Sequence, residues 1–264
     1  MMSSPALSLT PPPPGSTKQG HQIVLSEATM DQNYDKLVER LRKKAEELKD
    51  TPDGTQYWVG IAGGPGSGKT TTSNKVAERL NKSFGSDSDD FCVVLPMDGF
   101  HYSQSELQEL DPPDGVYYMK RRGAPWTMNA ELCYDLLSKA KQAGCGELPS
   151  YCREISDPIP GGVTLSTKHK IVFVEGLYLL WGDDERWAPL QKLWDEQWFI
   201  KCPSRDDQRE RLVKRSLENW SETKVKNWGP GRAGAEAKVD ANDAPNMDIV
   251  APSEKYANVI VESV

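Results

Sequence analysis

The sequence predicts an α/β fold in which helices cover both faces of a mostly parallel sheet, a three-layer sandwich. Short, continuously apolar runs bounded by Gly, Pro or Asp are typical of strands buried on both faces. These runs alternate with segments of helical periodicity, as right-handed strand–helix–strand units require. A chain of 264 residues is long enough for one such unit with a single core.

The first expected element is an amphipathic helix from Tyr34 to about Asp50, where apolar residues recur at helical spacing among Lys and Glu. The apolar runs place strands at 58–62, 91–95, 171–174, 198–200 and 259–261. The periodic segments place helices at 71–84, 129–143, 189–194 and 205–220. Asn129 is expected to cap the helix that follows it, and Gly144 to end that helix.

Composition excludes several classes of protein. Hydrophobic residues make up 37% and charged residues 27%, which is typical of a globular chain. No apolar run has the length of a membrane span, and a net charge of -7 argues against a nucleic-acid surface. The five scattered cysteines form neither a disulfide framework nor a zinc motif. We therefore expect a cytoplasmic protein that binds neither nucleic acid nor membrane.

The first 30 residues are too poor in large apolar side chains to order themselves, so we expect a tail. Residues 31–264 then form a single domain. The proline run at 11–14 is either part of a plain flexible tail or a polyproline II ligand for a partner. No signal peptide is apparent.

The first strand leads directly into a glycine-rich loop that fits the pattern G-x-x-x-x-G-K-[ST] and precedes a helix. In such a phosphate-binding loop (P-loop) the backbone N–H groups point at a polyphosphate, and the positive end of the helix adds attraction. Lys69 is expected to reach the β and γ phosphates of ATP, and the Thr70 hydroxyl to hold Mg²⁺. The residues expected to bind the nucleotide here are Gly63, Gly64, Pro65, Gly66, Ser67, Gly68, Lys69, Thr70 and Thr71.

The loop alone does not distinguish between a GTPase, a motor ATPase and a kinase. The sequence contains no N-K-x-D or D-x-x-G motif, which disfavours a switch GTPase. It also contains no LSGGQ-like segment, which disfavours a transporter ATPase. The remaining question is which group receives the phosphate.

Two carboxylates follow buried strands at the point where each strand ends. Asp98 follows the 91–95 run and Glu175 follows the 171–174 run. Ligands of an open parallel sheet lie outside the carboxyl ends of its strands. Phosphoryl transfer to a hydroxyl needs a carboxylate to accept the proton and others to hold Mg²⁺. Asp98 suits the first role and Glu175 the second, whereas each could instead be a turn residue ahead of glycine.

The strings GGPGSGKT, MDGFH, RRGAP and VFVEGLYLL resemble those of the P-loop small-molecule kinases, which include uridine kinase, phosphoribulokinase and bacterial-type pantothenate kinase. The resemblance covers about residues 55–250 and is strongest to uridine kinase-like fungal and bacterial members. It implies that Asp98 is the general base and that Glu175 contributes to the magnesium site. It also implies that Asn242 and Asn246 lie near the adenine.

Arginines at 205, 209, 211 and 215 share one helical pattern at the start of an expected lid, residues 204–234. They form either a solvated basic face or, as the resemblance favours, a lid that closes over the triphosphate. Arg211 and Arg215, one helical turn apart, are the expected catalytic arginines. The glycine-rich segment 229–234 is expected to give the lid mobility.

The insertion at 101–157 separates the two carboxylate strands and is the expected acceptor site. Its candidate substrate-binding residues are His101, Tyr102, Arg121, Arg122 and Arg153. A surface cluster is the alternative for Arg121 and Arg122. Cys152 stands where relatives usually carry an Asp.

These observations predict an ATP- and Mg²⁺-dependent kinase that phosphorylates a hydroxyl of a small metabolite, such as a nucleoside, pantothenate or a sugar-like compound. The alternative is a nucleotide-binding regulatory or adaptor protein with a degenerate acceptor site, which the Cys152 substitution favours. The sequence leaves the acceptor open, and a homodimer as well.

Overall fold

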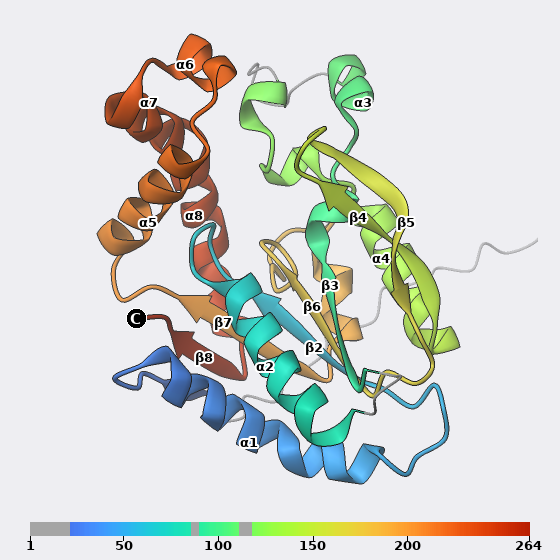
Figure 1. Cartoon of the computed structure of the whole chain (residues 1–264). Helices are drawn as coiled ribbons and strands as arrows, with labels where there is room; N and C mark the ends of the chain where they lie inside the picture. The colour runs from blue at the N-terminus through green and yellow to red at the C-terminus, as the bar shows by residue number, and fades with distance from the viewer. Residues whose placement is uncertain (1–21, 86–89, 111–117) are drawn as a thin grey trace, which may run out of the picture.

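A six-stranded parallel sheet forms the centre of the computed structural model, which describes residues 22–85, 90–110 and 118–264 (Figure 1). Its strands, in spatial order, are β1 (Ile23–Leu25), β8 (Val259–Glu262), β7 (Glu196–Lys201), β2 (Tyr57–Ala62), β6 (Ile171–Gly176) and β3 (Cys92–Pro96). The five expected strands are all present. The expected three-layer α/β fold is therefore confirmed.

Helices cover both faces of the sheet. One face packs against α1 (Met30–Leu48) and α2 (Lys69–Phe84) through a continuous apolar cluster that includes Leu41, Val76 and Trp198. The other face packs against α4 (Ala130–Ala143) and the 3-10 turn η4 (Ala188–Leu193). The sheet is apolar on both faces because each face is covered in this way.

Local capping sets the helix ends. The Thr29 hydroxyl accepts a hydrogen bond from the Gln32 N–H, and the Gln32 side chain accepts one from the Thr29 N–H, so α1 begins with a capping box. The Asn129 side chain accepts from Leu132 N at 2.9 Å at the start of α4. Gly144, with φ 69°, follows the last residue of that helix. Both caps of α4 are as predicted.

Strand β1 was not expected, because it lies within the segment predicted as a tail. It pairs with β8 from Ile23↔Val259 to Leu25↔Val261, so the folded chain begins before residue 30. Residues 1–21, including the proline run, lie outside the described residues. The expected helix at 189–194 is the short 3-10 turn η4 instead, with a proline in its first turn.

An antiparallel hairpin, also not expected, begins in the insertion and extends beyond it to Leu165. Its strands are β4 (Gly146–Cys152) and β5 (Asp157–Leu165), and it lies beside α3 (Gln104–Glu109) at the upper right of Figure 1. Prolines at 149, 158 and 160 make this segment look unlike a strand. The two-stranded hairpin accommodates them, because a strand at a sheet edge tolerates a missing N–H.

The expected lid is helical and stands opposite the hairpin in Figure 1. It consists of α5 (Arg205–Glu218), α6 (Glu222–Trp228) and α7 (Gly231–Lys238), followed by a π-helical turn and α8 (Ala244–Val250). Leu212, Val213 and Ala235 form a small apolar core of its own. Among the helices of the described ranges, none is long and apolar enough to cross a bilayer.

Gly60 provides a test of the packing beneath the P-loop. A Cβ added at this position of β2 would lie 2.6 Å from the Trp194 ring, and both residues are buried. We expect Gly60→Ala to lower the free energy of unfolding by about 1–3 kcal/mol, the usual cost of overpacking. Urea denaturation measures this change in the free energy of unfolding. The loss should be smaller in a Trp194→Leu background, and an equal loss in both backgrounds would contradict this account.

Candidate active site

The P-loop joins β2 to α2 and has a backbone that only glycine allows at two positions. Gly68 has φ 94° at the start of α2, in the left-handed region that side chains disfavour. A Cβ on Gly63 would lie 2.2 Å from the carbonyl oxygen of Ile200. The loop therefore packs directly against β7. In addition, the buried Ser67 hydroxyl has no hydrogen-bond partner among the described residues.

Lys69 is the central charged group of the loop. Its side chain is buried, and its ammonium donates a hydrogen bond to Gly64 O at 3.0 Å. Burial lowers the pKa of Lys69, whereas the nearby carboxylates of Glu175 and Asp98 act to raise it, and Arg215 acts to lower it. The predicted lysine and both predicted carboxylates are thus electrostatic neighbours.

Glu175 lies at the end of β6, beside the first turn of α2. Its Oε1 accepts a hydrogen bond from Thr70 Oγ1 at 3.1 Å. Burial raises the pKa of Glu175, and Asp98 raises it further, while Lys69 and the Thr70 hydrogen bond oppose this. The pairing Pro96↔Glu175 between β3 and β6 explains why Asp98 is close, because Asp98 is two residues beyond Pro96.

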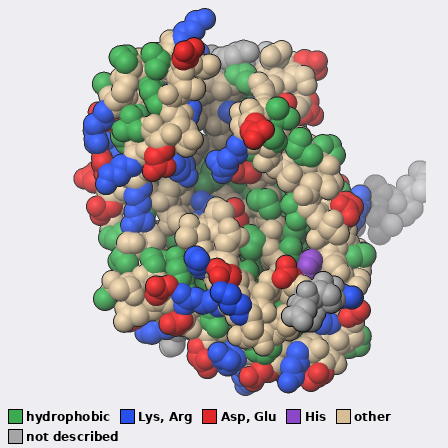
Figure 2. All heavy atoms as spheres, viewed as in Figure 1, with side chains coloured by type: hydrophobic (Ala, Val, Ile, Leu, Met, Phe, Trp, Pro, Cys, Tyr) green, Lys and Arg blue, Asp and Glu red, His purple; other side chains and the backbone are tan. Residues whose placement is uncertain are grey.

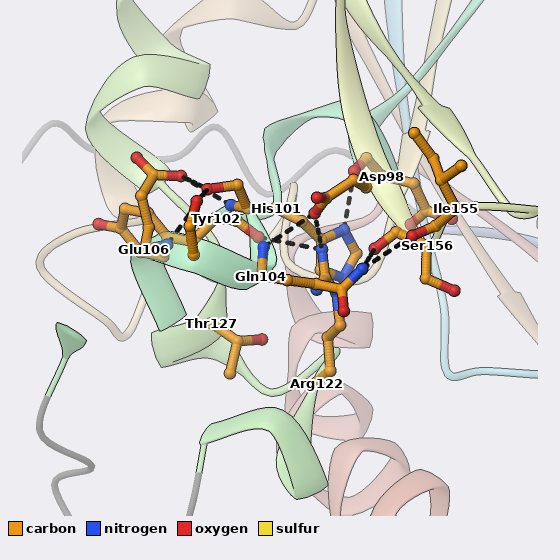
Figure 3. A network of polar contacts seen from close by, with 12 residues as sticks. Asp98, His101, Tyr102, Gln104, Glu106, Arg122, Thr127, Ile155 and Ser156 are labelled. Carbon is orange, nitrogen blue, oxygen red and sulfur yellow. Dashed lines mark hydrogen bonds and ion pairs between the residues drawn. The ribbon is translucent and has the colours of Figure 1, made fainter. Parts of the chain in front are cut away.

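Asp98 is more open to solvent than Glu175. It belongs to the 3-10 turn Met97–Phe100, and its side chain is 45% exposed. Arg153 Nη2, from the turn of the hairpin, lies 3.9 Å from Asp98 Oδ2. The carbonyl oxygen of Asp98 is 2.7 Å from His101 Nδ1, which ties the turn to the insertion (Figure 3).

The other candidate substrate residues mostly hold the insertion together. Arg122 Nη2 donates to Tyr102 O at 3.0 Å (Figure 3) and to Asp157 Oδ1 at 3.0 Å, so this guanidinium links the segment before α3 to the hairpin. The Arg121 guanidinium lies 5.1 Å from the Trp126 ring centroid. Of the five predicted substrate residues, only Arg153 is paired with the Asp98 side chain.

The two predicted lid arginines point to different surroundings. Arg211 donates to Ser263 Oγ and Ser263 O, both at 2.8 Å, so its guanidinium is bound to the chain beyond β8. Arg215 is the one that acts electrostatically on Lys69. The lid also contacts the P-loop through Gln208, whose Nε2 donates to Pro65 O at 2.7 Å. No sequence motif pointed to Gln208.

The placement of Asn242 and Asn246 near the adenine stays a prediction, and the structure shows their contacts within the protein. Asn242 Nδ2 donates to Arg122 O at 3.0 Å, and the Asn246 side chain lies beside Gly123. They connect the base of the lid to the insertion. A cavity of about 230 Å³ next to Gly64 is lined by residues of β7, α5 and α8, among them Met247. It is a second candidate position for the adenine.

Fold and site together define a P-loop kinase. The family model described as phosphoribulokinase / uridine kinase matches residues 58–200. A candidate uridine kinase of Schizosaccharomyces pombe is 30% identical over 237 residues, which are 89% of this chain and 91% of that protein. An ATP-dependent kinase-like protein of Aspergillus versicolor is 32% identical over 158 residues, 58% of this chain and 85% of that one.

A solved structure agrees with these sequence matches. A candidate fructose transport system kinase from Silicibacter sp. TM1040 superposes with a TM-score of 0.67 at 26% identity, covering 89% of this chain and 99% of that one. The chain belongs to the phosphoribulokinase / uridine kinase family. The predicted resemblance is confirmed.

His101 provides a test of how tightly the insertion packs around Asp98. Burial lowers the pKa of His101, with Asp98 opposing and Arg122 adding to the effect. The unfolded chain therefore binds this proton more readily, and stability falls as pH drops below the ordinary histidine pKa. As the pH falls from 7.5 to 5.5, the free energy of unfolding of the wild type should fall by up to about 1.4 kcal/mol per pH unit more than that of His101→Gln, as measured by urea denaturation. If the free energies of unfolding of the two proteins change equally with pH, the burial of His101 does not have this effect.

Proposed function

We propose that this protein is an ATP- and Mg²⁺-dependent kinase that transfers the γ-phosphoryl group to a hydroxyl of a small metabolite. The observation that carries the proposal is the cluster of Lys69, Glu175 and Asp98. It joins a P-loop lysine to two carboxylates at the ends of the neighbouring strands β6 and β3. A P-loop beside two such carboxylates supplies the parts that phosphoryl transfer needs.

In the proposed reaction the acceptor hydroxyl oxygen attacks the γ-phosphorus of ATP. A bond forms between these atoms while the bond from the γ-phosphorus to the β–γ bridging oxygen breaks, and ADP leaves. The Asp98 carboxylate takes the hydroxyl proton. Asp98 is suited to this because its side chain is about half exposed to solvent, whereas Glu175 is buried against Thr70.

The donor set fits Mg²⁺ held together with a nucleotide. Thr70 Oγ1 and Glu175 Oε1 are oxygen donors 3.1 Å apart, and magnesium takes oxygen ligands, usually one or two carboxylates with phosphates and water. Within the described ranges, no group of three or more His, Cys, Asp or Glu side chains could hold a metal by itself. When bound, Mg²⁺ would neutralise charge on the phosphates.

The lid supplies the remaining positive charge. Arg215 acts electrostatically on the lysine of the P-loop and is suited to stabilise charge on the transferred group. Arg211, fixed to Ser263, is better suited to position α5 against the P-loop. Leu212 assists this packing, because its side chain approaches Gly66 closely.

An adaptor that binds nucleotide without catalysis is the alternative function. Cys152, the residue that favoured it, ends β4 and pairs with Asp157 of β5. Asp157 places a carboxylate in the insertion, bound to Arg122. We favour the kinase because Lys69, Glu175 and Asp98 are brought together, whatever residue stands at position 152. A cytoplasmic location, a homodimer and a partner for the proline run remain predictions from the sequence.

Replacing Asp98 by Asn tests the general base. ATP affinity should change little, because Lys69 and the P-loop backbone make the phosphate contacts, while the rate of acceptor phosphorylation should fall by about a hundredfold or more. Coupled ADP release and calorimetric ATP binding measure the two effects. Turnover retained at the wild-type rate would remove Asp98 from this role.

Replacing Glu175 by Gln tests the magnesium site separately. Loss of the carboxylate charge next to Thr70 should raise the Mg²⁺ concentration needed for half-maximal rate by about tenfold, the scale of one charge-assisted contact. The matched control is Asp98→Asn, in which the residual rate should keep the wild-type Mg²⁺ dependence. An unchanged Mg²⁺ titration in Glu175→Gln would place the metal elsewhere.

A further inference from the structure

A cavity of about 470 Å³ lies between the hairpin and the lid. Figure 2 shows the molecule hollowed between these two parts, with blue cationic side chains along the hollow. Its walls come from both sides of the cleft and consist of Tyr151, Arg153, Ser156, Leu212, Arg215, Ser216, Asn219, Lys224, Lys238 and Asp243.

The lining of this cavity is strongly cationic, although the chain as a whole carries a net charge of -7. Four of its side chains are Lys or Arg and one is a carboxylate. That carboxylate, Asp243, forms an ion pair with Lys238 at 3.2 Å. In the described part of the chain, neither Arg215 nor Lys224 has a carboxylate within ion-pair distance. The cavity therefore holds positive charge that the protein does not compensate.

Lys224 is the clearest example of this excess. Its ammonium donates to the carbonyl oxygen of Asn219, which leaves donors for another partner. Burial lowers the pKa of Lys224, and the positive charge of Lys238 lowers it further. Holding two ammonium groups together costs free energy, and a bound anion would remove that cost.

The four cations that line the cavity have different neighbours. Arg215 acts on Lys69, where the γ-phosphate of ATP would lie. Arg153 lies beside Asp98, the proposed base. Lys224 belongs to α6 and Lys238 to α7, the two lid helices that follow α5 in the chain. Arg215 and Arg153 are thus associated with the proposed reacting groups, whereas Lys224 and Lys238 are available to another part of the acceptor.

We propose that the acceptor is an anion, a hydroxyl compound that carries a carboxylate or a phosphate monoester, and that Lys224 and Lys238 bind its charged group. The hydroxyl then lies at Asp98, next to Arg153, which lines the same cavity. This inference rests on the proposed function, because it names the substrate class of the same site. Lys238 is already paired with Asp243, so a neutral acceptor would leave the charge of Lys224 without a carboxylate among the described residues.

Matched pairs of acceptors that differ only in charge test the proposal. Glycerate is compared with glycerol, and ribose 5-phosphate with ribose, in two measurements: equilibrium dialysis to the ADP-bound protein and acceptor-stimulated ADP release from ATP. We expect an anionic member of the panel to bind at least about tenfold more tightly than its neutral counterpart. Equal or tighter binding of the neutral members, or no binding by either anion, would overturn the proposal.

The double variant Lys224→Ala, Lys238→Ala assigns the effect to these residues. It should weaken binding of the anionic acceptor by about tenfold or more, while ATP affinity and binding of the neutral counterpart stay unchanged. Lys226→Ala is the matched control, because Lys226 lies on the same helix but is exposed and does not line the cavity. Lys224→Arg should retain binding. Equal loss in the Lys226 variant would overturn the assignment.

The two measurements also separate this inference from the proposed function. If the protein is not a kinase but the cavity does bind anions, dialysis will show binding that the double variant loses, without any ADP release. If it is a kinase of a neutral acceptor, ADP release will respond to a neutral member and dialysis will show no preference for the anion.

Discussion

A buried ammonium group set between two carboxylates is the constraint on which the site depends. Lys69 loses hydration by burial and is held by Gly64 O, while Glu175 and Asp98 favour its charged form. Glu175 in turn is buried and pushed toward its neutral form, opposed by Lys69. Neither charge is fully satisfied by the protein alone. A triphosphate with Mg²⁺ would supply the missing partners of both, so the energetic cost of this cluster in the free protein favours ligand binding.

The fold produces this cluster through strand topology and completes it with the lid. Because β3 and β6 are parallel neighbours, their carboxyl ends meet at one edge, and β2 delivers the P-loop to the same edge. The lid then packs directly on the loop through Gln208 and Leu212. Positive charge from the lid and from the hairpin therefore converges on one cleft from opposite sides (Figure 2).

The sequence predicted those residue positions that follow from the order of strands in the sheet. It did not predict those that depend on contacts between distant parts of the chain. Asp98 and Glu175 could be placed together because any parallel sheet brings its strand ends to one edge. The different surroundings of Arg211 and Arg215 could not be predicted, because Arg211 is bound to Ser263, which is distant in the sequence. The hairpin was hidden by its prolines, and β1 by its three-residue length and its position after a polar segment. The binding of Asn242 to Arg122 O depends on a contact between lid and insertion that no local pattern encodes.

A crystal structure with a non-hydrolysable ATP analogue and Mg²⁺ would show whether Lys69, Glu175 and Asp98 surround the reacting phosphate. We expect the β and γ phosphates at Lys69 and the metal about 2.1 Å from Thr70 Oγ1, with Glu175 as a ligand directly or through one water. We also expect the Asp98 carboxylate on the open side of the γ-phosphate, with room for a hydroxyl between them. A triphosphate bound away from Lys69, or with Asp98 on its far side, would show that these residues do not form the transfer site.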